Sequence, residues 1–127
     1  MLQKYLTVSL LFFSVHMMGQ GDVAFFNAIK NNDMEIVSNY LQNQLDFCIF
    51  DNQEYLSKKD ATLKLNQFLS NYKIQSVEII HQGASKGKTS QFKVAKMTTL
   101  KEIFRVFVYT TGNFGSQSVK EIRIDKF

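Results

Sequence analysis

The spacing of apolar residues divides the chain into a helical part and a strand-rich part. Apolar positions recur every three or four residues after Asp22 and again after Asp33, which predicts two capped helices separated by a break at residues 31–32. Ser57 is expected to open a third helix, with Asp60 in the place of the usual Glu of a capping box. The apolar stripes of these helices are Phe25, Phe26 and Ile29, then Met34, Val37, Tyr40 and Leu41, then Ala61, Leu65, Phe68, Leu69 and Tyr72.

Alternation of apolar and polar residues predicts one strand between the second and third helices and four more after Tyr72. The first covers residues 45–50 and is followed by turn-forming residues at 51–54. The others are expected at about residues 75–82, 90–98, 102–110 and 117–125, with connections of hairpin length. Helices on the N-terminal side of a curved, mostly antiparallel sheet indicate the α+β class, in the order α-α-β-α-β-β-β-β.

The turns also predict which side chains share a face of the sheet. If residues 99–101 form a turn, Val94 lies near Val106 and Phe92 near Val108, and even-numbered residues face the helices. That helix-facing set continues with Phe104, Ile122 and Ile124. The opposite, odd-numbered set is Lys93, Ala95, Met97, Ile103, Arg105, Phe107, Tyr109, Val119, Glu121 and Arg123. This second face is too apolar to remain in water, so we expect a cover for it, most simply a second copy in a two-fold homodimer.

The first residues have the order of a secretory signal. Lys4 precedes an apolar run at residues 5–15, and small residues follow at Gly19 and Gly21. The run is shorter than the roughly 20 apolar residues that span a bilayer. We therefore expect a signal peptide at residues 1–20 and one domain at residues 21–127, exported to the periplasm or the extracellular space. The alternative is an uncleaved helix that packs on the domain or anchors it.

Composition excludes several classes of function. The net charge of +4 comes from scattered lysines rather than from a basic block, which argues against nucleic acid as a partner. Cys48 is the single cysteine, so an intramolecular disulfide and a CxxC metal or redox site are ruled out. We expect no metal and no cofactor. The twelve phenylalanines supply apolar area for a core.

Four segments, with the order of the elements, carry a resemblance to a known family: residues 57–61 (SKKDA), 79–83 (IIHQG), 104–109 (FRVFVY) and 121–124 (EIRI). They resemble the domain of unknown function 4783 family, short secreted proteins of Bacteroidetes. That family is similar in fold to the nuclear transport factor 2-like, or cystatin-like, superfamily, in which helices and a bent sheet form a cone. The resemblance covers about residues 22–126. It implies this fold and supplies no catalytic residues, so catalysis would rest on fold analogy alone.

His81 is the one weak catalytic candidate. It shares the parity of the apolar residues before it in its strand, which places it at the rim of the cone pocket, and imidazole exchanges protons near neutral pH. An enzyme would need a carboxylate beside it, for which Asp46 and Asp51 are the candidates. The alternative is a structural histidine held by the backbone or by Tyr55.

His81, Tyr55 and Lys96 are the candidate ligand-binding residues. Arg105 interrupts an apolar strand, and a structural ion pair with Glu121 is favoured over an anion-binding role. Cys48 is expected to be a small buried residue rather than a reactive thiol.

Three functions remain open. We favour a non-catalytic module that binds a small apolar ligand or a peptide, or interacts with another protein. The second is a lyase or isomerase that uses His81 in the cone pocket. The third is a structural subunit of an envelope complex.

Overall fold

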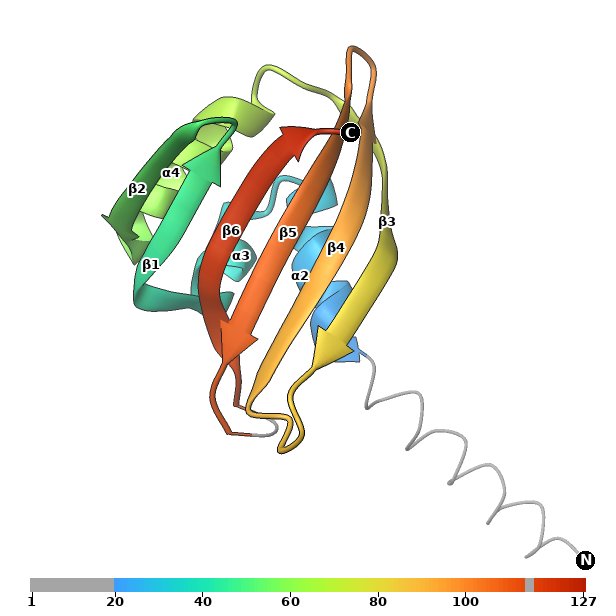
Figure 1. Cartoon of the computed structure of the whole chain (residues 1–127). Coiled ribbons are helices and arrows are strands. Elements are labelled where there is room, and N and C mark those ends of the chain that lie inside the picture. The colour runs from blue at the N-terminus through green and yellow to red at the C-terminus, as the bar shows by residue number, and fades with distance from the viewer. Residues whose placement is uncertain (1–19, 114–115) are drawn as a thin grey trace, which may run out of the picture.

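A computed structural model describes residues 20–113 and 116–127 of the chain. Within these residues, three helices pack on one face of a six-stranded sheet, behind it in the view of Figure 1. The helices are α2 (Gln20–Lys30), α3 (Met34–Tyr40) and α4 (Lys58–Leu69). The strands are β1 (Leu41–Ile49), β2 (Asn52–Ser57), β3 (Ile74–Ala84), β4 (Ser90–Thr99), β5 (Ile103–Thr111) and β6 (Ser118–Lys126). The expected α+β class is confirmed, whereas the predicted signal peptide lies outside the described residues except for Gln20.

Two of the three predicted helix starts are formed as expected. The carboxylate of Asp33 accepts a hydrogen bond from the backbone N–H of Ile36 at 3.3 Å. The hydroxyl of Ser57 accepts one from the N–H of Asp60 at 3.2 Å. Each bond satisfies a donor that has no partner within its helix. The helix α2 is described from Gln20 onward, so Asp22 lies within the helix rather than before its first residue.

The sheet has the strand order β2-β1-β6-β5-β4-β3. The strands β1 and β6 are parallel and all other neighbours are antiparallel. The strand β2 occupies part of the segment that the turn-forming residues 51–54 suggested was a loop. It is a largely exposed edge strand, so it lacks the buried alternate positions by which the other strands are recognised in sequence.

The register of the β4–β5 hairpin differs by one residue from the expected one. Ala95 pairs with Val106 and Met97 with Phe104, because the turn includes Glu102, whose carbonyl accepts the N–H of Thr99 at 2.9 Å. A one-residue shift exchanges the two faces of a strand. The helix-facing residues of β4 are therefore Lys93, Ala95 and Met97, and Phe92 and Val94 lie on the opposite face.

Val119 was also assigned to the wrong face. The β5–β6 register shifts between Tyr109 and Thr110, so that Tyr109 pairs with Glu121 and Thr110 with Val119. This irregularity turns Val119 into the core, where it is 2% exposed. The even-numbered assignments on β5 and β6 are correct: Phe104, Val106, Val108, Ile122 and Ile124 are all buried.

An aromatic cluster fills the space between α4 and the sheet near the β1–β2 turn. The ring of Phe104 lies 5.2 Å from that of Phe68 and 4.8 Å from that of Tyr72, measured between ring centroids. Phe50, in the turn, contacts both Phe68 and Phe104. Here the space between α4 and the sheet is packed with the protein's own side chains.

Candidate functional site

His81 lies on the outer face of the sheet, not on the helix-facing side. The β3–β4 register shifts between Ile79 and His81, so that Ile79 pairs with Ala95 in the core and His81 pairs with Val94. The imidazole lies 5.4 Å from the ring of Phe92, centroid to centroid. The predicted position at the rim of the cone is thus wrong, because strand parity reverses across the irregularity.

The residues proposed as partners of His81 lie toward the opposite edge of the sheet, on β1, β2 and the turn between them. Tyr55 is 68% exposed on β2, which is one edge strand, whereas β3 is the opposite edge. Asp46 lies on β1 and Asp51 in the exposed β1–β2 turn, so three strands separate them from His81. Neither the catalytic pair nor the structural contact with Tyr55 is formed.

Lys96 and Arg105 converge on Phe127. They pair across β4 and β5, and the Nζ of Lys96 and the Cζ of Arg105 each lie 5.0 Å from the centroid of that ring. The residue opposite Arg105 on β6 is Asp125, and Glu121 instead pairs with Arg123 through an ion pair of 3.4 Å. The expected Arg105–Glu121 pair is therefore wrong, because it assumed a different register.

The outer face turned toward the viewer in Figure 1 carries none of the described helices. Side chains of β3, β4, β5 and β6 gather there. The ring of Phe92 stacks on that of Phe107 at 6.1 Å between centroids, and Phe92 pairs with Tyr109. We call the apolar side chains of this face the outer patch: Phe92, Val94, Ile103, Phe107, Tyr109 and Phe127. All are half-buried or exposed, Ile103 and Phe127 the most, at 40% and 51%.

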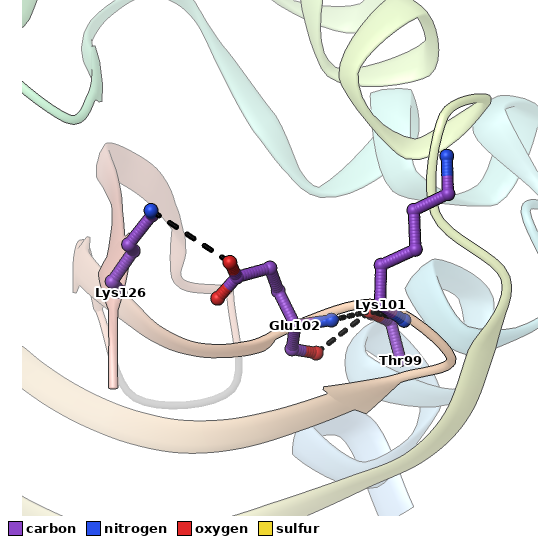
Figure 2. A network of polar contacts seen from close by, with 4 residues as sticks. All are labelled: Thr99, Lys101, Glu102 and Lys126. Atoms are coloured by element: carbon purple, nitrogen blue, oxygen red, sulfur yellow. Dashed lines mark hydrogen bonds and ion pairs between the residues drawn. The ribbon is translucent and has the colours of Figure 1, made fainter.

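An open depression of about 600 Å³ lies at one end of this face, beside the β4–β5 turn. Its lining includes three exposed apolar residues, Leu100, Ile103 and Phe127. Figure 2 shows a polar network among its lining residues, in which the hydroxyl of Thr99 accepts the N–H of Glu102 at 3.0 Å. Lys126 forms an ion pair of 3.7 Å with the Glu102 carboxylate. These bonds fix the turn, and hence the register of the outer patch.

The same network contains a local sequence signal for the length of this turn. Thr99 begins the turn, and a threonine hydroxyl that bonds to backbone N–H groups two and three residues later is typical of such turns. Recognising Thr99 as a turn residue of this kind extends the loop to Glu102 and places Phe92 and Val94 on the outer face. Phe127 carries no comparable local signal, because its contacts are with residues more than twenty positions away.

Other chemistry is sparse in the described part of the chain. Residues 20–113 and 116–127 hold no group of three or more His, Cys, Asp or Glu side chains arranged for a metal ion. Cys48 is a buried free thiol that donates to the carbonyl of Phe50 at 3.1 Å. None of the described helices has both the length and the apolar character needed to cross a bilayer.

Comparison with known proteins agrees with this architecture. The family model described as "Domain of unknown function (DUF4783)" matches residues 23–125. The chain belongs to the DUF4783 family. The family resemblance of the sequence motifs is thus confirmed. No curated protein shows a significant sequence match to the chain.

Solved structures of DUF4783 family proteins share the fold. One from Bacteroides uniformis is 26% identical, with a TM-score of 0.74 over 82% of this chain and 94% of its own. One from Bacteroides ovatus is 22% identical, with a TM-score of 0.75 over 82% and 93%. An NTF2-like protein from Cytophaga hutchinsonii is 17% identical, with a TM-score of 0.62 over 84% and 92%. The expected nuclear transport factor 2-like fold is confirmed.

Proposed function

We propose that this DUF4783 domain is a non-catalytic interaction module, exported from the cytoplasm, that docks through the outer patch. The observation that carries this proposal is the sheet face that none of the described helices covers, on which aromatic rings from β4 and β5 lie side by side. Contiguous apolar patches on a soluble domain usually mark contact surfaces. Aromatic residues are also enriched at the centres of protein interfaces.

The geometry favours this function over the enzyme and the small-ligand module. His81 lies beside a phenylalanine on an open face, and general acid–base catalysis needs a second group within hydrogen-bond reach of the same substrate. A small-molecule site is ordinarily concave and encloses most of its ligand. In this domain four aromatic side chains occupy the space next to α4, and the depression at the β4–β5 turn is open.

The first partner that we propose is a second copy of the chain, because a two-fold axis lets identical patches cover one another. Sedimentation velocity of residues 21–127 over a range of micromolar concentrations tests this. We expect a monomer–dimer equilibrium that Phe107→Glu shifts toward monomer by at least about tenfold in Kd, since a carboxylate would be buried without a partner.

The matched control is Leu63→Glu, which makes the same chemical change at a 50% exposed position on α4. This variant should associate like the wild-type domain. A wild-type domain that stays monomeric throughout, with the same sedimentation coefficient as Phe107→Glu, would refute the dimer. Docking of a different protein, as in an envelope complex, would then have to be sought on the same face.

A further inference from the structure

The loop between β3 and β4 lies in a part of the chain that is rich in lysine and contains no acidic residue. Residues 79–101 contain five lysines and no Asp or Glu, and residues 103–120 contain Arg105 and Lys120 and no Asp or Glu. The β3–β4 and β5–β6 loops lie at the same end of the sheet (Figure 1). The two loops therefore place lysines, and no carboxylate of their own, at that end.

Hydrogen bonds join these two loops. The N–H of Gly112 donates to the carbonyl of Thr89 at 3.0 Å. The side-chain amide of Gln117 donates to the carbonyl of Lys88. The hydroxyl of Thr110 donates to the amide oxygen of Gln117 at 3.2 Å and so holds this amide in place. The β3–β4 loop is therefore fixed by the neighbouring hairpin as well as by its own strands.

The β3–β4 loop begins with a tight turn at residues 85–88. The N–H of Lys88 donates to the carbonyl of Ser85 at 3.0 Å. The central residues Lys86 and Gly87 do not have positive φ, so the turn is of type I. Lys88 follows with a φ of 55°, in the left-handed region. This succession of conformations directs the N–H groups of Gly87, Lys88 and Thr89 toward one point, and such a concavity binds anions.

Several donors around this turn are available to a ligand. The N–H groups of Gly87 and Thr89 have no acceptor among the described residues, and the ammonium of Lys86 has no ion pair there. The hydroxyl of Thr89 lies 3.5 Å from that of Ser85, which accepts the N–H of Ser90 at 3.2 Å. Residues 85–89 are all exposed. The turn therefore offers backbone N–H groups, a hydroxyl and a cation to a ligand from solvent.

We infer that residues 85–89 form a binding site for a phosphate group. The N–H groups of Gly87 and Thr89 donate to the phosphate oxygens, and Lys86 supplies the opposite charge. A terminal phosphate carries a charge of about −1.5 to −2 at pH 7 and three strong acceptor oxygens, so it satisfies these donors together. A carboxylate has fewer oxygens and a smaller charge. This inference goes beyond the proposed function and does not depend on dimerisation.

The loop differs from the phosphate-binding loop of nucleotide enzymes. In that motif, G-x-x-x-x-G-K-[ST], a helix follows the loop and its N-terminus binds the phosphates of the nucleotide. Here three residues separate Gly83 from Gly87, and the strand β4 follows from Ser90. The turn therefore has donors for a single phosphate group rather than for a nucleotide. A lipid headgroup and a soluble phosphate ester both present such a group, and the experiment distinguishes these two sources.

Amide NMR of isotope-labelled residues 21–127 tests the site. The probe is inorganic phosphate, added at constant ionic strength, and a parallel titration uses acetate. We expect saturable shifts centred on the amides of Gly87, Lys88 and Thr89. The Kd for phosphate should be at least about fivefold lower than the Kd for acetate, because the phosphate accepts more charge-assisted hydrogen bonds.

Two substitutions of Lys88 separate the backbone site from a general effect of charge. Lys88→Gly and Lys88→Val remove the same cation, but glycine adopts positive φ freely, whereas a β-branched residue does so at a steric cost. We expect Lys88→Gly to bind phosphate with a Kd within about threefold of wild type, and Lys88→Val at least about tenfold more weakly. Lys86→Gln should raise the Kd by about threefold or more. Lys101→Gln, at the other end of β4, is the control and should leave the Kd unchanged.

Vesicles identify the source of the phosphate. The probes are phosphatidylcholine vesicles with and without phosphatidic acid, whose headgroup is a terminal phosphate. Co-sedimentation with phosphatidic acid that Lys88→Val abolishes and Lys88→Gly retains assigns the site to a lipid headgroup. Binding of phosphate without binding to these vesicles assigns it to a soluble phosphate ester. Shifts spread over all lysines, equal binding of acetate, or equal Kd values for Lys88→Gly and Lys88→Val would overturn the phosphate site.

Discussion

The two faces of the sheet use the same strands but differ in how their apolar residues are covered. On the helix-facing side Val106 and Ile122 are 2% and 1% exposed. On the outer side Ile103 is 40% exposed, and its neighbours in the outer patch are half-buried or exposed. Helices of one small domain cover one side of its sheet, so the core is completed within the chain. The comparison teaches that the described helices bury one face of the sheet only, and burial of the other face is the role of the partner that we propose.

The largest expected difference between the faces is the effect of shortening an isoleucine on stability. Ile122→Ala should lower the free energy of unfolding by about 2–4 kcal/mol, because it leaves a cavity among packed residues. Ile103→Ala makes the same change on the outer face and should cost less than about 1 kcal/mol, as is usual for exposed positions. Urea unfolding provides the measurement.

Both substitutions should be made in the Phe107→Glu background, so that association does not contribute to stability. Equal losses of unfolding free energy in the two variants would contradict the distinction between the buried helix-facing side and the outer face. Such a result would place Ile103 in the core of the isolated domain.

A smaller effect is expected at Gly83, which pairs with Phe92 on the outer face. A Cβ at this position would lie 2.5 Å from the Cε1 of Phe92, so Gly83→Ala must displace the ring. Because that ring stacks on Phe107, we expect weaker dimerisation, by about threefold to tenfold in Kd, with a change in monomer stability below about 1 kcal/mol.

Gly87→Ala is the matched control, since its Cβ would meet Thr89 at an ordinary contact distance of 3.8 Å. That variant should associate normally. Unchanged sedimentation of Gly83→Ala beside a normal Gly87→Ala variant would show that the position of the Phe92 ring does not matter for association.

Local chemistry explains which parts of the fold were predictable. The caps at Asp33 and Ser57 depend on a side chain and a backbone N–H three residues away, so the sequence shows them directly. The burial of Val106 and Ile122 follows from alternation within β5 and β6, whose pairing is regular at these positions. The strand β2 was missed because an exposed edge strand gives no apolar alternation.

The candidate site was less predictable because it depends on strand registers. Irregularities near His81 and Val119 reverse parity along a strand, and each is determined by pairing with a neighbouring strand. The turn at Thr99 adds a one-residue shift that exchanges the faces of β4. This shift is why the predicted register places Phe92 and Val94 with the core. The predicted outer positions of Phe107 and Tyr109 on β5 are correct.

The most direct test of the two-face account is the dependence of the urea unfolding midpoint on protein concentration. For a domain that unfolds from a dimer, each tenfold rise in concentration adds about 1.4 kcal/mol of stability per dimer. We predict that the midpoint of the wild-type domain increases with concentration, that Ile122→Ala lowers the midpoint but keeps this dependence, and that Phe107→Glu abolishes it. A wild-type midpoint independent of concentration, or an equal dependence in Phe107→Glu, would contradict the account.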